Sequence, residues 1–120
     1  MYGGIPGVEH RVPFLFSKGF LQEKLTLQKI IQLLSSNVAD YFGLKSKGYL
    51  KVGYDADIAF IDLWNSEIIS ASNMHSKGKY TPFEGSVFDT VVQKVFLRGT
   101  EIMNKEKKTD DLFCGEYIST

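Results

Sequence analysis

The sequence predicts a mixed α/β fold, and two stretches carry that prediction. Residues 26–35 place apolar side chains at spacings of three, four and seven, which is typical of one face of an amphipathic helix. Residues 58–61 form a short apolar run rich in β-branched and aromatic residues, which is typical of a strand, and we expect this strand to extend to residue 63. A chain of 120 residues suits one domain with a modest core.

Composition excludes several classes of function. The 14 basic and 14 acidic residues balance, so nothing indicates a nucleic-acid or membrane-surface partner. No apolar stretch approaches the roughly 20 residues of a membrane span, and the N-terminus does not have the pattern of a signal peptide. A single cysteine, Cys114, excludes an internal disulfide and indicates a reducing, cytoplasmic setting.

The first quarter of the chain reads as a loop followed by helices. Glycines and a proline in residues 1–9 predict the loop. Residues 12–16 are apolar and predict a short helix that tolerates Pro13 in its first turn and ends at Gly19. The clearest helix covers residues 26–35, with Thr26 as its N-cap.

The side chains of this clearest helix form one apolar stripe, which we interpret as a core face. The stripe consists of Leu27, Ile30, Ile31 and Leu34. A second short helix is expected over residues 38–42, capped by Ser36 or Asn37. Gly43 is placed as its C′ residue.

Residues 47–57 are rich in turn signals. Gly48 and Gly53 can adopt positive φ where the chain reverses. Asp55 and Asp57 can accept hydrogen bonds from nearby backbone N–H groups in a tight turn. The apolar run that follows is short and continuous, which predicts a strand buried on both sides.

The second half of the chain predicts short strands and one long loop. A short strand over residues 67–70 precedes a polar, irregular loop, and loops of this length in compact domains usually have a function. Residues 91–97 and 101–103 predict two strands joined by a tight turn, that is, a hairpin. The charged run 104–111 indicates a solvated or disordered tail.

Four segments resemble the C-terminal part of the cyclic amidohydrolases, the group of dihydroorotases, allantoinases and dihydropyrimidinases. They are GIPGVE at 4–9, NVADYFGL at 37–44, KGYLKVGYDADIAFID at 47–62 and SKGKYTPFEG at 76–85. They occur in the order that the family has them. The resemblance extends to about Met103 and covers only the C-terminal part of the family's much longer chain.

The resemblance implies a fold and a domain organisation. Residues 1–46 would end a (β/α)8 barrel, with a substrate-facing loop and the terminal helices. Residues 47–104 would belong to the small β-sandwich domain, with a long loop, 71–86, returning along the barrel, and residues 105–120 would be a C-terminal tail. The fold class is then α/β, a C-terminal fragment of a TIM-barrel amidohydrolase plus part of its small β-sandwich.

The resemblance also implies substrate contacts but no metal site in this chain. In dihydroorotases the backbone before the IPG triplet contacts the ring amide of the substrate, which corresponds to Gly3 and Gly4. The family binds zinc, as one or two divalent ions, through paired histidines, a carboxylated lysine and an aspartate. Only His10 and His75 occur here, without paired spacing, so we expect no metal ligand and no catalytic residue.

The remaining charged side chains fit structural roles better than acid–base roles. The carboxylates concerned are Asp55, Asp57, Asp62 and Glu84, which we expect at turns and strand ends. His75 and Lys77 lie in the long loop, and we expect neither to be catalytic.

The resemblance implies a parent enzyme that opens a cyclic amide with metal-activated water. Dihydroorotase, the pyrimidine-biosynthesis enzyme that interconverts dihydroorotate and N-carbamoyl-aspartate, is favoured by residues 4–9 and 76–85. Allantoinase and dihydropyrimidinase (hydantoinase) share most of these features. The implied partners are a small cyclic amide, the rest of the barrel and further copies in a homo-oligomer, and the fragment alone would be inactive. The alternative of another class is a non-catalytic family member that acts in assembly.

Overall fold

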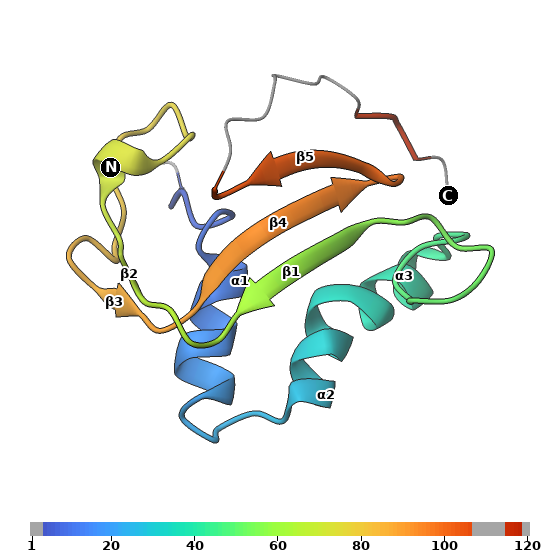
Figure 1. Ribbon diagram of the computed structural model, residues 1–120, viewed down its shortest axis with the longest axis horizontal. Coiled ribbons are helices and arrows are strands. Elements are labelled where there is room, and N and C mark those ends of the chain that lie inside the picture. The colour runs from blue at the N-terminus through green and yellow to red at the C-terminus, as the bar shows by residue number, and fades with distance from the viewer. Residues whose placement is uncertain (1–3, 107–114, 119–120) are drawn as a thin grey trace.

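The computed structural model describes residues 4–106 and 115–118, with helices preceding strands along the chain (Figure 1). The first helical segment is α1, Arg11–Phe14, which continues as a π-helical turn over Leu15–Phe20. The second combines α2, Leu27–Ile31, a π-helical turn over Gln32–Ser36, and α3, Asn37–Phe42. No helix among these residues is long and apolar enough to cross a membrane.

The strands form two small antiparallel sheets. The larger has the order β1-β4-β5, made of Ile58–Asp62, Val91–Leu97 and Thr100–Asn104. The smaller pairs β2, Glu67–Ile68, with β3, Val87–Phe88. A 3-10 turn, Ala71–Asn73, lies in the long loop between β2 and β3. Figure 1 shows the helical segments gathered on one side of the larger sheet, so the predicted mixed α/β class is confirmed.

The hairpin predicted near residue 98 is present. Strands β4 and β5 pair from Leu97 opposite Thr100. Arg98 and Gly99, which join them, have φ of 47° and 80°. Positive φ at both central residues is the signature of the type I′ turn, whose twist matches that of the flanking strands.

The first helical segment does not end at Gly19. It runs to Phe20, and Gly19 is buried inside it. A Cβ atom at Gly19 would lie 3.2 Å from Leu25 Cδ1 and 3.6 Å from Ile30 Cδ1. The prediction was wrong because this glycine lets the chain pack closely against the next helical segment rather than ending its own. Pro13 does lie in the first turn, as predicted.

The second helical segment is continuous. The Thr26 hydroxyl accepts a hydrogen bond from the backbone N–H of Lys29 at 3.2 Å, so the predicted N-cap is confirmed. The helix expected over residues 38–42 is present as α3, but Ser36 has helical φ and ψ and makes no capping hydrogen bond, so the prediction of a capped helix start at Ser36 or Asn37 is wrong. The π-helical turn carries the chain through without a break. Gly43 ends the segment at φ 63°, as predicted.

The expected core faces are only partly covered. Ile30 is fully buried, whereas Leu27 and Ile31 of the same stripe are 43% and 49% exposed. Ala59 and Phe60 in β1 are also exposed. The prediction of a strand buried on both sides is therefore wrong, because β1 lies at the edge of its sheet and only part of its surface is covered.

We expect Ile30→Ala to destabilise the chain by about 2–5 kcal/mol, since it removes a fully buried side chain and leaves a cavity. Ile31→Ala is the matched control: it has the same chemistry and the same effect on helix propensity, but its side chain is half exposed. Urea unfolding followed by the helical circular dichroism signal measures both. Equal losses for the two variants would contradict the observed burial.

Candidate functional site

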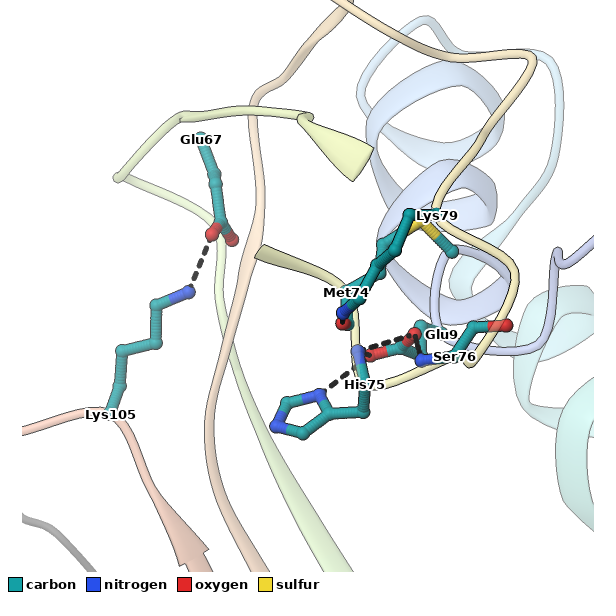
Figure 2. A network of polar contacts seen from close by, with 7 residues as sticks. All are labelled: Glu9, Glu67, Met74, His75, Ser76, Lys79 and Lys105. Atoms are coloured by element: carbon teal, nitrogen blue, oxygen red, sulfur yellow. Dashed lines mark hydrogen bonds and ion pairs between the residues drawn. The ribbon is translucent and has the colours of Figure 1, made fainter. Parts of the chain in front are cut away.

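The loop at residues 4–10 lies against residues 74–81, more than 60 positions further along the chain. Figure 2 shows the Glu9 carboxylate beside the backbone of His75 and Ser76. The backbone N–H of His75 donates to both carboxylate oxygens, at 3.1 and 3.2 Å, and the N–H of Ser76 donates to Oε2 at 3.3 Å. The His75 ring completes the contact, with Nδ1 2.7 Å from Oε1.

These contacts favour the charged form of Glu9. Partial burial alone would raise the pKa of the carboxyl group, but hydrogen bonds from the N–H groups and ring of His75 and from the N–H of Ser76 outweigh it. The pKa of Glu9 is therefore lowered below its ordinary value of 4.5. A carboxylate that accepts several N–H groups is a strong, charge-assisted acceptor.

The lowered pKa of Glu9 sets the direction of a pH effect. The contact should stabilise the loop fully above the ordinary value of 4.5, and its contribution should be lost as the pH falls through the lowered value. The Glu9 side-chain chemical shift and the amide exchange of His75 and Ser76 measure this. Glu9→Gln should remove the titration. A carboxyl group that titrates at or above 4.5 would contradict the prediction.

A second contact holds the start of the same loop. The Tyr80 hydroxyl donates a hydrogen bond to the Gly4 carbonyl oxygen. Gly4 has φ 155°, and a Cβ atom built on it would meet no atom within 4 Å, so its backbone borders open space. The other residue predicted to bind substrate, Gly3, lies outside the described residues. Substrate binding by Gly3 and Gly4 stays a prediction.

His10 packs into the interior of the protein. It is buried, its Nδ1 lies 3.2 Å from Thr81 Oγ1, and its ring meets the rings of Phe83 and Phe88 edge to face, at centroid distances of 5.7 and 6.3 Å. The ring therefore forms a third contact between the loop and the segment near residue 80. This environment suits a packed, hydrogen-bonded histidine.

The residues fit no metal site within the part of the chain that the structure describes. No group of three histidine, cysteine, aspartate or glutamate side chains is placed to hold an ion there. His75 is directed to Glu9 and its side chain is 95% exposed. Cys114 lies outside the described residues. Zinc is therefore not assigned to any residue that the structure describes.

The other predicted carboxylates make structural contacts. Asp62 accepts hydrogen bonds from the backbone N–H of Trp64 at 2.8 Å and from the Asn65 amide at 2.6 Å. Glu84 accepts from the backbone N–H of Ala71 at 2.7 Å, inside the long loop. These are the turn and strand-end roles that the sequence indicated.

Asp55 and Asp57 flank the Lys47 ammonium group, at 2.8 and 2.5 Å. Hydrogen bonds to Asp55 and Asp57 raise the pKa of Lys47. Partial burial would raise the pKa of Asp57, but Lys47 and the backbone N–H of Arg98, 2.8 Å away, lower it. The cluster therefore joins the turn before β1 to the hairpin turn between β4 and β5.

The sequence did not indicate that Glu9 contacts the segment at residues 74–81. Nor did it indicate that Tyr80 and Thr81 contact the loop at residues 4–10. Each side chain lies in an irregular loop, where no periodicity identifies its partner. The only available signal was the presence of both loops among the family-like motifs. A long loop of this kind commonly has a function, and here it holds a second loop in place.

The sequence and fold match known proteins over most of the chain. The profile of the amidohydrolase family matches residues 13–102. An allantoinase from Bacillus licheniformis is 34% identical over 98% of this chain, and a dihydroorotase from Archaeoglobus fulgidus is 41% identical over 91%. The structure of an L-hydantoinase (dihydropyrimidinase) from Arthrobacter aurescens superposes over 98% of the chain with a TM-score of 0.91 and 28% identity.

The chain belongs to the amidohydrolase family. Its relatives include enzymes named allantoinase, dihydroorotase and D-phenylhydantoinase, so the match is to the cyclic-amide branch of the family. The chain spans about a quarter of each: 26% of the allantoinase, 27% of the dihydroorotase and 26% of the L-hydantoinase chain. The expected resemblance to part of a TIM-barrel amidohydrolase is confirmed.

Proposed function

We propose that the protein containing this chain hydrolyses the C–N bond of a cyclic amide, and that this chain supplies its C-terminal quarter. The observation that carries the proposal is the match over nearly the whole chain to an allantoinase, a dihydroorotase and an L-hydantoinase. All three names denote enzymes of the same branch of the family. In this proposal the rest of the enzyme supplies the metal ligands, since the chain spans about a quarter of each of these relatives.

In this proposal the chain contributes a backbone surface for the substrate. Gly3 and Gly4 would present peptide N–H and C=O groups to the ring amide, whose own N–H and C=O edge they complement. Gly4 suits the role because its backbone borders open space, where a side chain would otherwise stand. One or two zinc ions, supplied with their ligands by the rest of the enzyme, would activate the attacking water.

Dihydroorotate is the first substrate to test. The segments GIPGVE and SKGKYTPFEG support it, as does the 41% identity to the dihydroorotase. The 34% identity to the allantoinase covers more of this chain and supports allantoin as the second candidate. The single cysteine supports a cytoplasmic setting, and a homo-oligomer is the assembly that the family resemblance implies.

Ring-opening assays of the full-length protein decide the matter. Dihydroorotate, allantoin and dihydrouracil are offered side by side, with zinc or manganese supplied. A clear preference for one substrate, at least tenfold in kcat/KM, would identify the enzyme. Turnover of none, in a protein shown to bind metal, would overturn the proposal and favour a non-catalytic member that acts in assembly.

A further inference from the structure

Resting on the proposed function, we propose that Glu9 and Tyr80 are positioning residues, which hold the loop at residues 4–9 in the orientation that receives the cyclic amide. We call their contacts the loop clamp: Glu9 with His75 and Ser76, and Tyr80 with Gly4. Neither side chain is assigned a chemical step. Both would act through the backbone of the loop.

The loop needs such a clamp because its own sequence does not fix its shape. It contains Gly4 and Gly7, and glycine gives the backbone the widest choice of φ and ψ. Its apolar side chains do not anchor it, since Ile5 and Val8 are 69% and 81% exposed. A turn orders the second half of the loop, since the N–H of His10 donates to the Gly7 carbonyl oxygen at 3.2 Å. The placement of the loop against the rest of the protein must come from contacts with other segments.

The clamp acts at both ends. At the start, the Tyr80 hydroxyl fixes the direction of the Gly4 carbonyl. A trans peptide is planar, so fixing this C=O also fixes the Ile5 N–H, which points the opposite way. At the far end, the Glu9 carboxylate accepts two backbone N–H groups and contacts the His75 ring (Figure 2). The two ends of the loop are thus held, which narrows the conformations open to the peptide groups between them.

The clamp itself rests on a packed base. The His10 ring, directly after Glu9, is buried against Phe83 and Phe88 and meets Thr81. The segment near residue 80, which holds the loop, therefore packs against the interior of the protein and not only against other exposed residues. A displacement of about 1 Å of a substrate-positioning group can cost about a hundredfold in rate, so a rigid base matters for a loop of this kind.

The test uses the full-length protein and the ring amide that it turns over among dihydroorotate, allantoin and dihydrouracil. We expect Glu9→Ala and Tyr80→Phe to lower kcat/KM by about tenfold or more, chiefly through KM, because the substrate meets a loop that is no longer ordered. Glu9→Gln, which keeps one acceptor oxygen, should lose less than Glu9→Ala. Amide hydrogen exchange at residues 4–8 should accelerate in the same order.

Glu84→Gln is the matched control. Like Glu9, it has a carboxylate that accepts a backbone N–H, here that of Ala71. Like Tyr80, it lies in the long loop between β2 and β3, but its contacts stay within that loop. It should leave kcat/KM and exchange at residues 4–8 unchanged. If Glu9 had a merely structural role, Glu9→Gln and Glu84→Gln would have the same effect on kcat/KM and on amide exchange at residues 4–8. That result would overturn the proposal.

Other combinations of the exchange and kinetic results also test the proposal that Glu9 and Tyr80 are positioning residues. Faster exchange at residues 4–8 with unchanged kinetics would show a clamp without a positioning role, and unchanged exchange would show that these contacts do not order the loop. Either result overturns the proposal while turnover by the unaltered protein upholds the proposed function. Turnover of no cyclic amide by the unaltered protein overturns both.

Discussion

Phe88→Ala is expected to lower the free energy of unfolding by about 3–5 kcal/mol. Phe88 is 1% exposed, the most buried of the large aromatic residues that the structure describes. Its ring lies against those of Phe14 and Phe83, at centroid distances of 5.9 and 5.4 Å, so truncation removes contacts from both the helix and the long loop. Urea unfolding of the chain measures the loss.

Phe60→Ala is the control for this prediction. Phe60 has the same side chain and also faces an aromatic partner, Phe96, at 5.8 Å, but it is 51% exposed. The expected loss in the free energy of unfolding is therefore a fraction of that for Phe88→Ala, because Phe60 buries less apolar surface in the folded protein. Comparable losses would mean that the ring cluster around Phe88 does not form the core.

Gly48→Ala is expected to destabilise the chain by about 2–6 kcal/mol, from two causes that add. Gly48 has φ 83°, a conformation that strains any residue with a side chain. The new Cβ atom would also lie 2.4 Å from the Cβ of Ala39 and 3.3 Å from the Ser35 carbonyl oxygen. The turn must then move away from the helix that it packs against.

Gly53→Ala separates the two causes. Gly53 has nearly the same φ, 88°, but a Cβ atom there would meet nothing within 4 Å, so only the strain of about 1–2 kcal/mol applies. Combining Gly48→Ala with Ala39→Gly should recover part of the loss by removing the clashing methyl group. Equal losses at Gly48 and Gly53, with no coupling to Ala39, would refute the close approach.

Features that depend on local chemistry could be predicted from the sequence. The cap at Thr26, the left-handed Gly43 and the hairpin turn at Arg98 and Gly99 each depend on a few neighbouring residues. The two failures in the helices have another origin. Gly19 packs against Leu25 and Ile30, and the helix passes Ser36 through a π-helical turn, so contacts beyond the local sequence decided both.

The candidate site was foreseen only as separate segments. The GIPGVE and SKGKYTPFEG segments were recognised independently, and the structure brings them into contact through Glu9 with Ser76 and through Tyr80 with Gly4. A separation of 66 residues between Glu9 and His75 leaves no periodic signal that could pair them.

The edge position of β1 has a practical consequence. Its sheet has the order β1-β4-β5, and β1 carries the exposed Ala59 and Phe60 beside an edge that can pair with another strand. Apolar edge strands are templates for strand addition between molecules. At high protein concentration these 120 residues alone should therefore associate through β1, and a lysine in place of Phe60 is the substitution that should reduce that association.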